Sequence, residues 1–170
     1  MRPMLRQPKN LPLTLFPADI LRKTISPVID PADEEVCTLI GDMRLTMVAA
    51  QGIGLAANQV GKDLRVFVID KELAVKAGIS DVFINPEIVE SRSKKISTAV
   101  MRPRRETSNM EEGCLSVPGK FGEVERPNEI IVSALDEHGK IFTVHAKGLL
   151  ARVLQHEMDH LNGMLFVDKI

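Results

Sequence analysis

The chain has 170 residues, of which 44% are hydrophobic and 26% are charged, and its formal net charge is -1. That length suits a single domain with its own core, and the near-neutral charge gives no electrostatic reason to expect specific binding of nucleic acid. The sequence also lacks tryptophan and tyrosine, two residues that stack well against unpaired bases. Nucleic-acid binding is therefore not expected as the main function.

The cysteine count and the hydropathy of the sequence indicate where in the cell the protein is located. Cys37 and Cys114 are the two cysteines of the sequence, which is too few for a disulfide framework. Residues 1–16 hold no continuous apolar run of signal-peptide length, and no later segment is long and apolar enough to span a bilayer. We expect a cytoplasmic protein outside the membrane. An organellar protein whose presequence has been removed is the open alternative.

The predicted elements begin with an irregular, proline-containing segment over residues 1–29, whose apolar residues should tuck against the core: Leu11, Leu13, Leu15 and Phe16. A helix should follow, with Asp30 as its N-cap and Pro31 in its first position, and Gly52 should end it. Cys37 in this helix is expected to be a small, buried or half-buried apolar residue. One helical face is apolar: Val36, Leu39, Ile40, Met43 and Met47.

Strand patterns dominate the chain between that helix and a last one. The last helix is predicted over residues 148–161, where Asn162 and Gly163 suit a left-handed C-cap. Residues 136–140 predict the turn of a hairpin. The predicted strands are residues 64–69, 82–85, 129–135, 141–145 and 164–167. Strands in runs, without strict alternation with helices, predict an α+β fold with mostly antiparallel sheets.

The last helix carries the strongest functional motif, the pentapeptide HEMDH at residues 156–160. Side chains four positions apart lie one above the other on a helix, so both imidazoles can reach one metal ion. Leu149 and Val153 precede the histidines on the same stripe, so two satisfied core histidines are the alternative. Because Glu157 stands between them at metal-site spacing, the motif favours a metal site.

A catalytic metal site usually has three protein ligands, and no histidine or glutamate follows His160 to supply the third. The upstream candidates are Cys114, Cys37, His138, His145 and several carboxylates. We favour Cys114 because the glycine before it permits close backbone approach and because a thiolate binds Fe(II) or Zn(II) well. A buried, unreactive thiol is the alternative. His138 in a turn is expected to be solvated, and His145 at a strand end is expected to be structural or exposed.

Two further segments depart from a simple core pattern. Residues 52–59 read GIGLAANQ, in which small residues allow close backbone approach and Gln59 offers an amide donor to an oxyanion; a purely structural turn is the alternative. We expect residues 91–109 to be a basic insertion that forms a solvated surface loop, with contact to RNA or another acidic surface as the alternative. Its basic residues are Arg92, Lys94, Lys95, Arg102, Arg104 and Arg105.

GIGLAANQ at 52–59, EGCLS at 112–116 and HEMDH at 156–160 together resemble the three signature motifs of peptide deformylases, and they occur in that family's order. The resemblance extends over most of residues 1–170 and implies one catalytic domain, with antiparallel sheets packed around the HExxH helix and a second, N-terminal helix. It also implies an enzyme that removes the formyl group from the N-terminal formyl-methionine of newly made proteins and releases formate.

Carried over to this sequence, the resemblance implies that Cys114, His156 and His160 hold one divalent metal ion. Fe(II) is the expected ion in the cell, and Zn(II), Ni(II) or Co(II) can occupy the same ligands. Glu157 would act as general base and then as general acid. Gln59 and the backbone N–H of Leu115 would stabilise the oxyanion.

The resemblance also implies a substrate-binding surface and partners. The residues expected to bind the formyl-methionyl end are Gly52, Ile53, Gly54, Leu55 and Gly113, with the turn at residues 149–153 as a further wall. Arg152 in that turn would alter the preference for residues after methionine if it pointed into the pocket. Many bacterial members continue into a C-terminal helix that docks on the ribosome; this chain ends at Ile170, so only a transient ribosome association is expected.

Two rival functions share parts of these motifs. A zincin-type endopeptidase also uses HExxH, but residues 161–170 contain no third ligand of the usual kind. A binding module or inactive relative with a structural ion would use the same histidines and cysteine, but it would leave Glu157 without a role.

Overall fold

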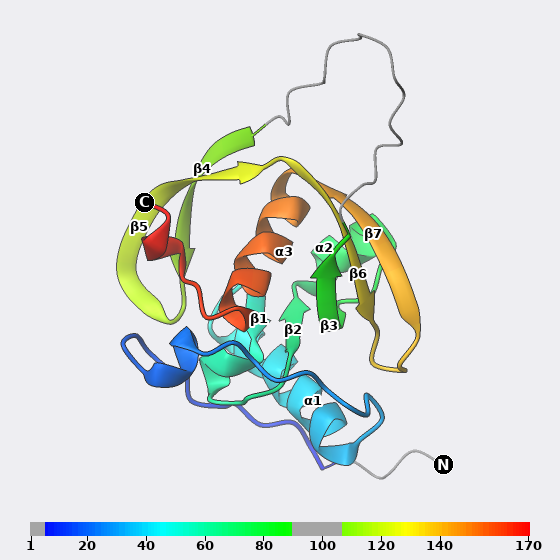
Figure 1. Cartoon of the computed structure of the whole chain (residues 1–170). Helices are drawn as coiled ribbons and strands as arrows, with labels where there is room; N and C mark the ends of the chain where they lie inside the picture. Colours follow the sequence, from blue (N-terminus) through cyan, green and yellow to red (C-terminus); the bar gives the residue numbers. More distant parts are fainter. Residues whose placement is uncertain (1–5, 90–106) are drawn as a thin grey trace, which may run out of the picture.

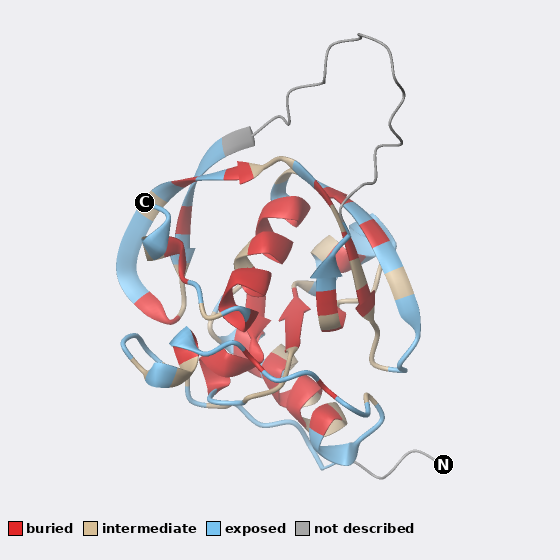
Figure 2. Cartoon of the chain, viewed as in Figure 1, coloured by how far each residue is buried: buried red, intermediate tan, exposed pale blue. Residues whose placement is uncertain are grey.

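One helix lies between two antiparallel sheets in this computed structural model, which describes residues 6–89 and 107–170 (Figure 1). This helix, α3, spans Gly148–Leu161 and packs against strands of both sheets. Most of its residues are buried, as Figure 2 shows. The predicted α+β class, with antiparallel sheets around this helix, is confirmed.

The larger sheet has five strands in the order β1-β2-β3-β6-β7, and neighbouring strands run antiparallel. Its strands are β1 Gly54–Ala56, β2 Val66–Ile69, β3 Val82–Ile88, β6 Glu129–Leu135 and β7 Ile141–Lys147. Four of these strands were predicted, with ends that differ by a few residues. The predicted hairpin is confirmed, because Leu135 pairs with Ile141 and the Asp136 side chain accepts hydrogen bonds from the backbone N–H groups of His138 and Lys140.

The smaller sheet is a hairpin of β4, Thr107–Cys114, and β5, Val117–Pro127, that the sequence did not predict. Both strands are largely polar and contain glycines, so they lack the β-branched, alternating pattern of an ordinary strand. Residues 107–109 belong to β4, which corrects the prediction that the loop extends to residue 109. The other residues of the predicted loop, with its six basic side chains, lie outside the described residues.

Helix α1, Glu34–Ala49, begins later than predicted. Asp33 is its N-cap, and the Asp33 side chain accepts a hydrogen bond from the Glu35 N–H, whereas Asp30 caps only a preceding turn through the Ala32 N–H. The predicted apolar face is buried. A short helix that was not predicted, α2, spans Lys71–Ala77 and is capped by Asp70.

The N-terminal segment crosses α1 and then approaches the sheets. Leu11 and Leu13 pack against the core, but Leu15 and Phe16 are 48% and 40% exposed, so the prediction that all four apolar residues are tucked in was wrong for two. Hydrogen bonds from Arg6 and Lys9 to Asp42 of α1 hold this segment in place. Burial raises the pKa of Asp42, but hydrogen bonds from the Arg6 guanidinium and the Lys9 N–H outweigh it and hold the pKa below its ordinary value.

The last helix ends as predicted, since Gly163 follows it with a φ of 72°. The predicted terminal strand at residues 164–167 was wrong. Phe166–Asp168 form a 3-10 turn, η3, because Asp168 closes it twice: its N–H donates to the Leu165 carbonyl and its carboxylate accepts from the Leu165 N–H. No helix among the described residues is long and apolar enough to cross a membrane.

Candidate metal centre and active site

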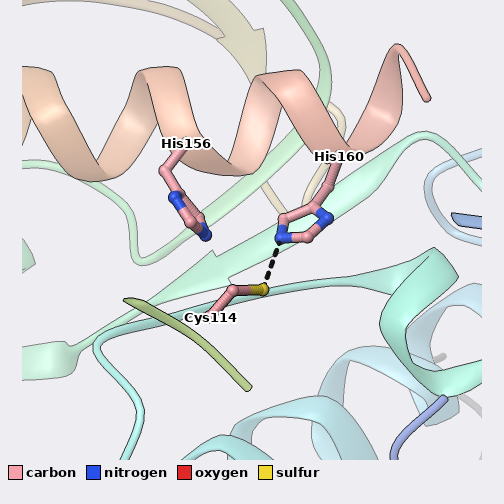
Figure 3. Close-up of side chains that lie close together, drawn as sticks. All are labelled: Cys114, His156 and His160. Atoms are coloured by element: carbon pink, nitrogen blue, oxygen red, sulfur yellow. Dashed lines mark hydrogen bonds between the residues drawn. The ribbon is translucent and has the colours of Figure 1, made fainter. Parts of the chain in front are cut away.

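The thiol of Cys114 and the imidazoles of His156 and His160 converge at one point, as Figure 3 shows. Their ligand atoms all lie within 4.8 Å of one another, and Cys114 Sγ is 3.2 Å from His160 Nε2. Because metal–nitrogen and metal–sulfur bonds are about 2.0–2.3 Å long, ligand atoms around one ion lie about 3–4 Å apart. The three side chains therefore fit one small cation with little adjustment.

The backbone explains this convergence. The two histidines lie one turn apart on α3, so their rings face the same side of the helix. Cys114 ends β4, where the register shifts between Gly113 and Cys114, and such an irregularity re-aims a side chain. A Cβ at Gly113 would lie 2.7 Å from the ring of Phe121, which is 66% exposed and would have to move aside for a larger residue.

Glu112 fixes the orientation of one of the imidazoles. Its carboxylate accepts a hydrogen bond of 2.9 Å from His156 Nδ1, which leaves Nε2 of that ring to face Cys114 and a metal ion. Burial lowers the pKa of His156, but hydrogen bonds with Cys114 and Glu112 outweigh it and raise the pKa to about 10. Cys114 and Glu112, which favour a proton on this ring, would favour a metal cation beside the ring for the same electrostatic reason. Burial keeps the pKa of His160 well below its ordinary value, so this ring is neutral and can bind a metal.

A buried ionic network holds Glu112 in turn. Its Oε1 accepts hydrogen bonds of 2.6 Å from Arg126 Nε and from Arg152 Nη1. Arg126 also donates to Asp159 on α3 at 2.8 Å, and therefore connects β5 to the helix that carries both histidines. Burial raises the pKa of Glu112, but the hydrogen bonds from Arg126 and His156 outweigh it and keep the pKa far below its ordinary value. Glu112 is therefore an anion that accepts a hydrogen bond from His156, one of the three candidate ligands.

Glu157 is 3% exposed and lies beside the glycine of β1. A Cβ at Gly54 would be 2.3 Å from Glu157 Oε1, so the absence of a side chain at this position makes room for the carboxylate. Burial raises the pKa of Glu157 to about 7. A carboxyl group with a pKa near neutrality can both accept and return a proton at neutral pH.

Gln59 reaches the same centre from the 3-10 turn η2, Ala57–Val60. Its Nε2 lies 3.5 Å from Cys114 Sγ and donates a hydrogen bond of 3.2 Å to Ser116 Oγ. Leu115, between these two residues, lies against Gly52, where a Cβ would be 2.8 Å from Leu115 Cδ1. The GIGLAANQ and EGCLS segments are therefore neighbours in space.

A pocket of about 440 Å³ opens onto this centre. Its lining includes Cys114, His156, Glu157 and Gln59. The rest of the wall is largely apolar and includes Ile53, Met110, Leu115, Phe121, Leu149 and Val153. An apolar pocket that ends at a few convergent polar groups is the usual form of a small-molecule or side-chain binding site.

The structure separates the predicted site residues into two groups. Gly52, Ile53, Gly54 and Gly113 line the pocket together with Cys114 and His156, whereas the side chain of Leu55 is fully buried in the core. Cys37 is half-buried as predicted and its thiol contacts the Pro31 carbonyl. His138 and His145 have exposed side chains.

The network around Glu112 was not predicted. Arg152 reaches the pocket, yet its guanidinium donates to Glu112 and to the Val124 carbonyl, so it supports the metal centre from behind. The sequence did offer one signal for this network. Glu112 stands two residues before Cys114, and there are arginines near both the EGCLS and the HEMDH motifs. Nothing in the sequence showed that Glu112 and His156, 44 positions apart, would meet.

The protein has the site of a metal-dependent hydrolase. The features that define this class are two histidines and a cysteine that converge, a buried glutamate beside them and an apolar pocket. The family model described as polypeptide deformylase matches residues 10–170. The chain is 45% identical to the peptide deformylase of Mesorhizobium japonicum over 94% of its own length and 83% of that protein. It is 47% identical to that of Acetivibrio thermocellus, over 89% of this chain and 78% of the relative.

Solved structures agree with the sequence relatives. The crystal structure of peptide deformylase from Thermotoga maritima matches with a TM-score of 0.79 and 39% identity, over 95% of this chain and 97% of that one. The chain belongs to the polypeptide deformylase family. It is a metal-dependent hydrolase of protein biosynthesis that removes the N-terminal formyl group from newly made polypeptides.

Proposed function

We propose that Cys114, His156 and His160 hold the metal ion of this deformylase and that Glu157 moves the protons of the reaction. The observation that supports this most directly is the convergence of the three ligand atoms within 4.8 Å beside a buried carboxyl group with a pKa of about 7. The donor set of one thiolate and two imidazoles suits a borderline divalent cation. We propose Fe(II) as the ion in the cell, with Zn(II), Ni(II) and Co(II) as substitutes.

The reaction adds water to the formyl carbon, breaks its bond to nitrogen, and yields formate and a free methionyl amine. A bound divalent ion supplies a water molecule of lowered pKa and polarises the formyl oxygen. Glu157 accepts the proton of the attacking water and then delivers it to the leaving amine. Negative charge that develops on the formyl oxygen is met by the Gln59 amide and the Leu115 N–H.

The substrate is the formyl-methionyl end of a nascent polypeptide. Ile53, Leu149 and Val153 offer apolar surface to the methionine side chain. The glycines of this surface leave room for its neighbouring side chains: Gly52 for Leu115, Gly54 for Glu157 and Gly113 for Phe121. Leu55 contributes through its backbone in β1 while its side chain packs in the core. We place the reaction in the cytoplasm, where transient association with the ribosome would bring the enzyme to this substrate.

The decisive experiment measures formate release under anaerobic conditions with Fe(II) restored, because a ferrous thiolate site is sensitive to oxidation. A formyl-methionyl peptide and a longer unformylated peptide are compared. We expect formate from the first and no cleavage of the second. Internal cleavage of the longer peptide would instead indicate an endopeptidase.

The Glu157→Ala variant separates a catalytic centre from a structural ion. We expect it to retain metal and to lose activity by a factor of about 100 to 10,000, the range for removal of a general acid–base group. Full activity in the variant would refute the role of Glu157. Metal content of the same preparation serves as the control.

A further inference from the structure

We propose that Ser116 is a positioning residue, which orients the carboxamide of Gln59 so that one N–H group faces the reacting formyl oxygen. This inference rests on the proposed function, because it concerns how Gln59 is held during that reaction. Ser116 ends the EGCLS motif and is fully buried, and Gln59 is 2% exposed. Their hydrogen bond, from Gln59 Nε2 to Ser116 Oγ, is 3.2 Å long.

The orientation of the amide follows from its partners. Gln59 Oε1 accepts a hydrogen bond of 2.9 Å from the Ala56 N–H. Because a backbone N–H can only donate, the side-chain atom that it meets has to be the oxygen. The NH₂ group is therefore the end that points toward Ser116 and Cys114, which is the end that an oxyanion needs.

The two N–H bonds of this NH₂ group have different partners. Gln59 Nε2 donates to Ser116 Oγ, a hydroxyl oxygen, at 3.2 Å and lies 3.5 Å from Cys114 Sγ, so each N–H bond has a partner of its own. Because Ala56 holds Oε1 and Ser116 holds one N–H, the second N–H is the one left to face a developing oxyanion beside Cys114. The hydroxyl of Ser116 thus anchors the amide through one N–H and leaves the other for the substrate.

Backbone hydrogen bonds from the N-terminal segment hold Gln59 and Ser116 next to each other. The N-terminal segment donates one hydrogen bond of 2.7 Å from the Thr14 N–H to the Gln59 carbonyl, and one of 2.8 Å from the Phe16 N–H to the Ser116 carbonyl. The same short segment therefore spans both residues. Since water is excluded at this depth, a lost bond to Ser116 would not be replaced easily.

A double-mutant cycle tests the inference. Kinetic constants are measured for Ser116→Ala in the wild-type background and in a Gln59→Ala background, with the metal-loaded enzyme. In the wild-type background we expect kcat to fall about 3- to 10-fold, the effect of one neutral hydrogen bond, with KM unchanged. In the Gln59→Ala background we expect a change of less than about 2-fold, because Ser116 acts through Gln59.

Equal losses in both backgrounds, or no loss in either, would overturn the inference. Ser133→Ala on β6, which changes a partly buried serine that does not line the pocket, is the control and should leave kcat unchanged. A wild-type enzyme that releases no formate would contradict the proposed function itself. An active enzyme in which Ser116→Ala lowers kcat equally with and without Gln59 would contradict only the role of Ser116.

A second measurement does not depend on whether Ser116→Ala folds. In the zinc-loaded wild-type protein, side-chain amide resonances of Gln59 are assigned by their loss in Gln59→Ala. We expect the Gln59 amide protons to exchange with solvent far more slowly than those of an exposed glutamine. Exchange at the rate of an exposed amide would refute the anchoring bond to Ser116.

Discussion

Replacement of Gly54 by alanine should inactivate the enzyme without removing its metal. The new Cβ would lie 2.3 Å from Glu157 Oε1 and 2.8 Å from Glu157 Cδ, whereas non-bonded heavy atoms prefer about 3.5 Å. The carboxylate therefore has to move by about 1 Å, and a displacement of that size at a reacting group can reduce the rate about 100-fold. Overpacking in the core should also lower the free energy of unfolding by about 1–3 kcal/mol.

Activity, metal content and thermal stability of Gly54→Ala are measured on the same preparation. We expect metal to be retained, because the three atoms nearest to the new Cβ all belong to Glu157 and not to the proposed ligands. Gly41→Ala on α1 is the matched control: its Cβ would lie 3.5 Å from Pro8 Cγ, an ordinary contact, so activity should not change. Activity of Gly54→Ala above half that of the wild type would refute the reasoning.

Three further predictions concern the ligands and the fold. Glu112→Gln weakens the acceptor for a ligand imidazole, so metal affinity measured by zinc titration should fall about 10- to 100-fold; unchanged affinity would contradict the orienting role. Cys114→Ala should lose metal and Cys37→Ala should retain it, and the reverse result would overturn the ligand assignment. The pKa of Asp42 is lower in the folded state, so its ionised form stabilises the fold above its unfolded pKa of about 3.9 and that contribution is lost as the pH falls further. Thermal melts should show Asp42→Asn less stable than wild type at pH 7, and the difference in melting temperature should narrow below about pH 4. A difference that stays constant with pH would show that the ionisation of Asp42 does not stabilise the fold.

The sequence by itself determined the elements whose patterns are local. Residues four apart place two imidazoles on one face of α3, and the apolar spacing of α1 predicts its buried side. The turn at Asp136 and the glycine after α3 have conformational preferences of their own, so the hairpin and the helix end were predicted correctly.

Tertiary structure decided what depends on contacts between distant segments. Cys114 lies 46 positions from His160, and the two meet only because the β4–β5 hairpin packs across α3. The hairpin itself is polar, contains glycines and is largely exposed, so the pairing of β4 with β5 and a few buried residues hold it, and no ordinary strand pattern predicts it. The ionic network of Glu112 has the same origin: each charged group is stable in the interior because a partner from another strand or helix compensates it.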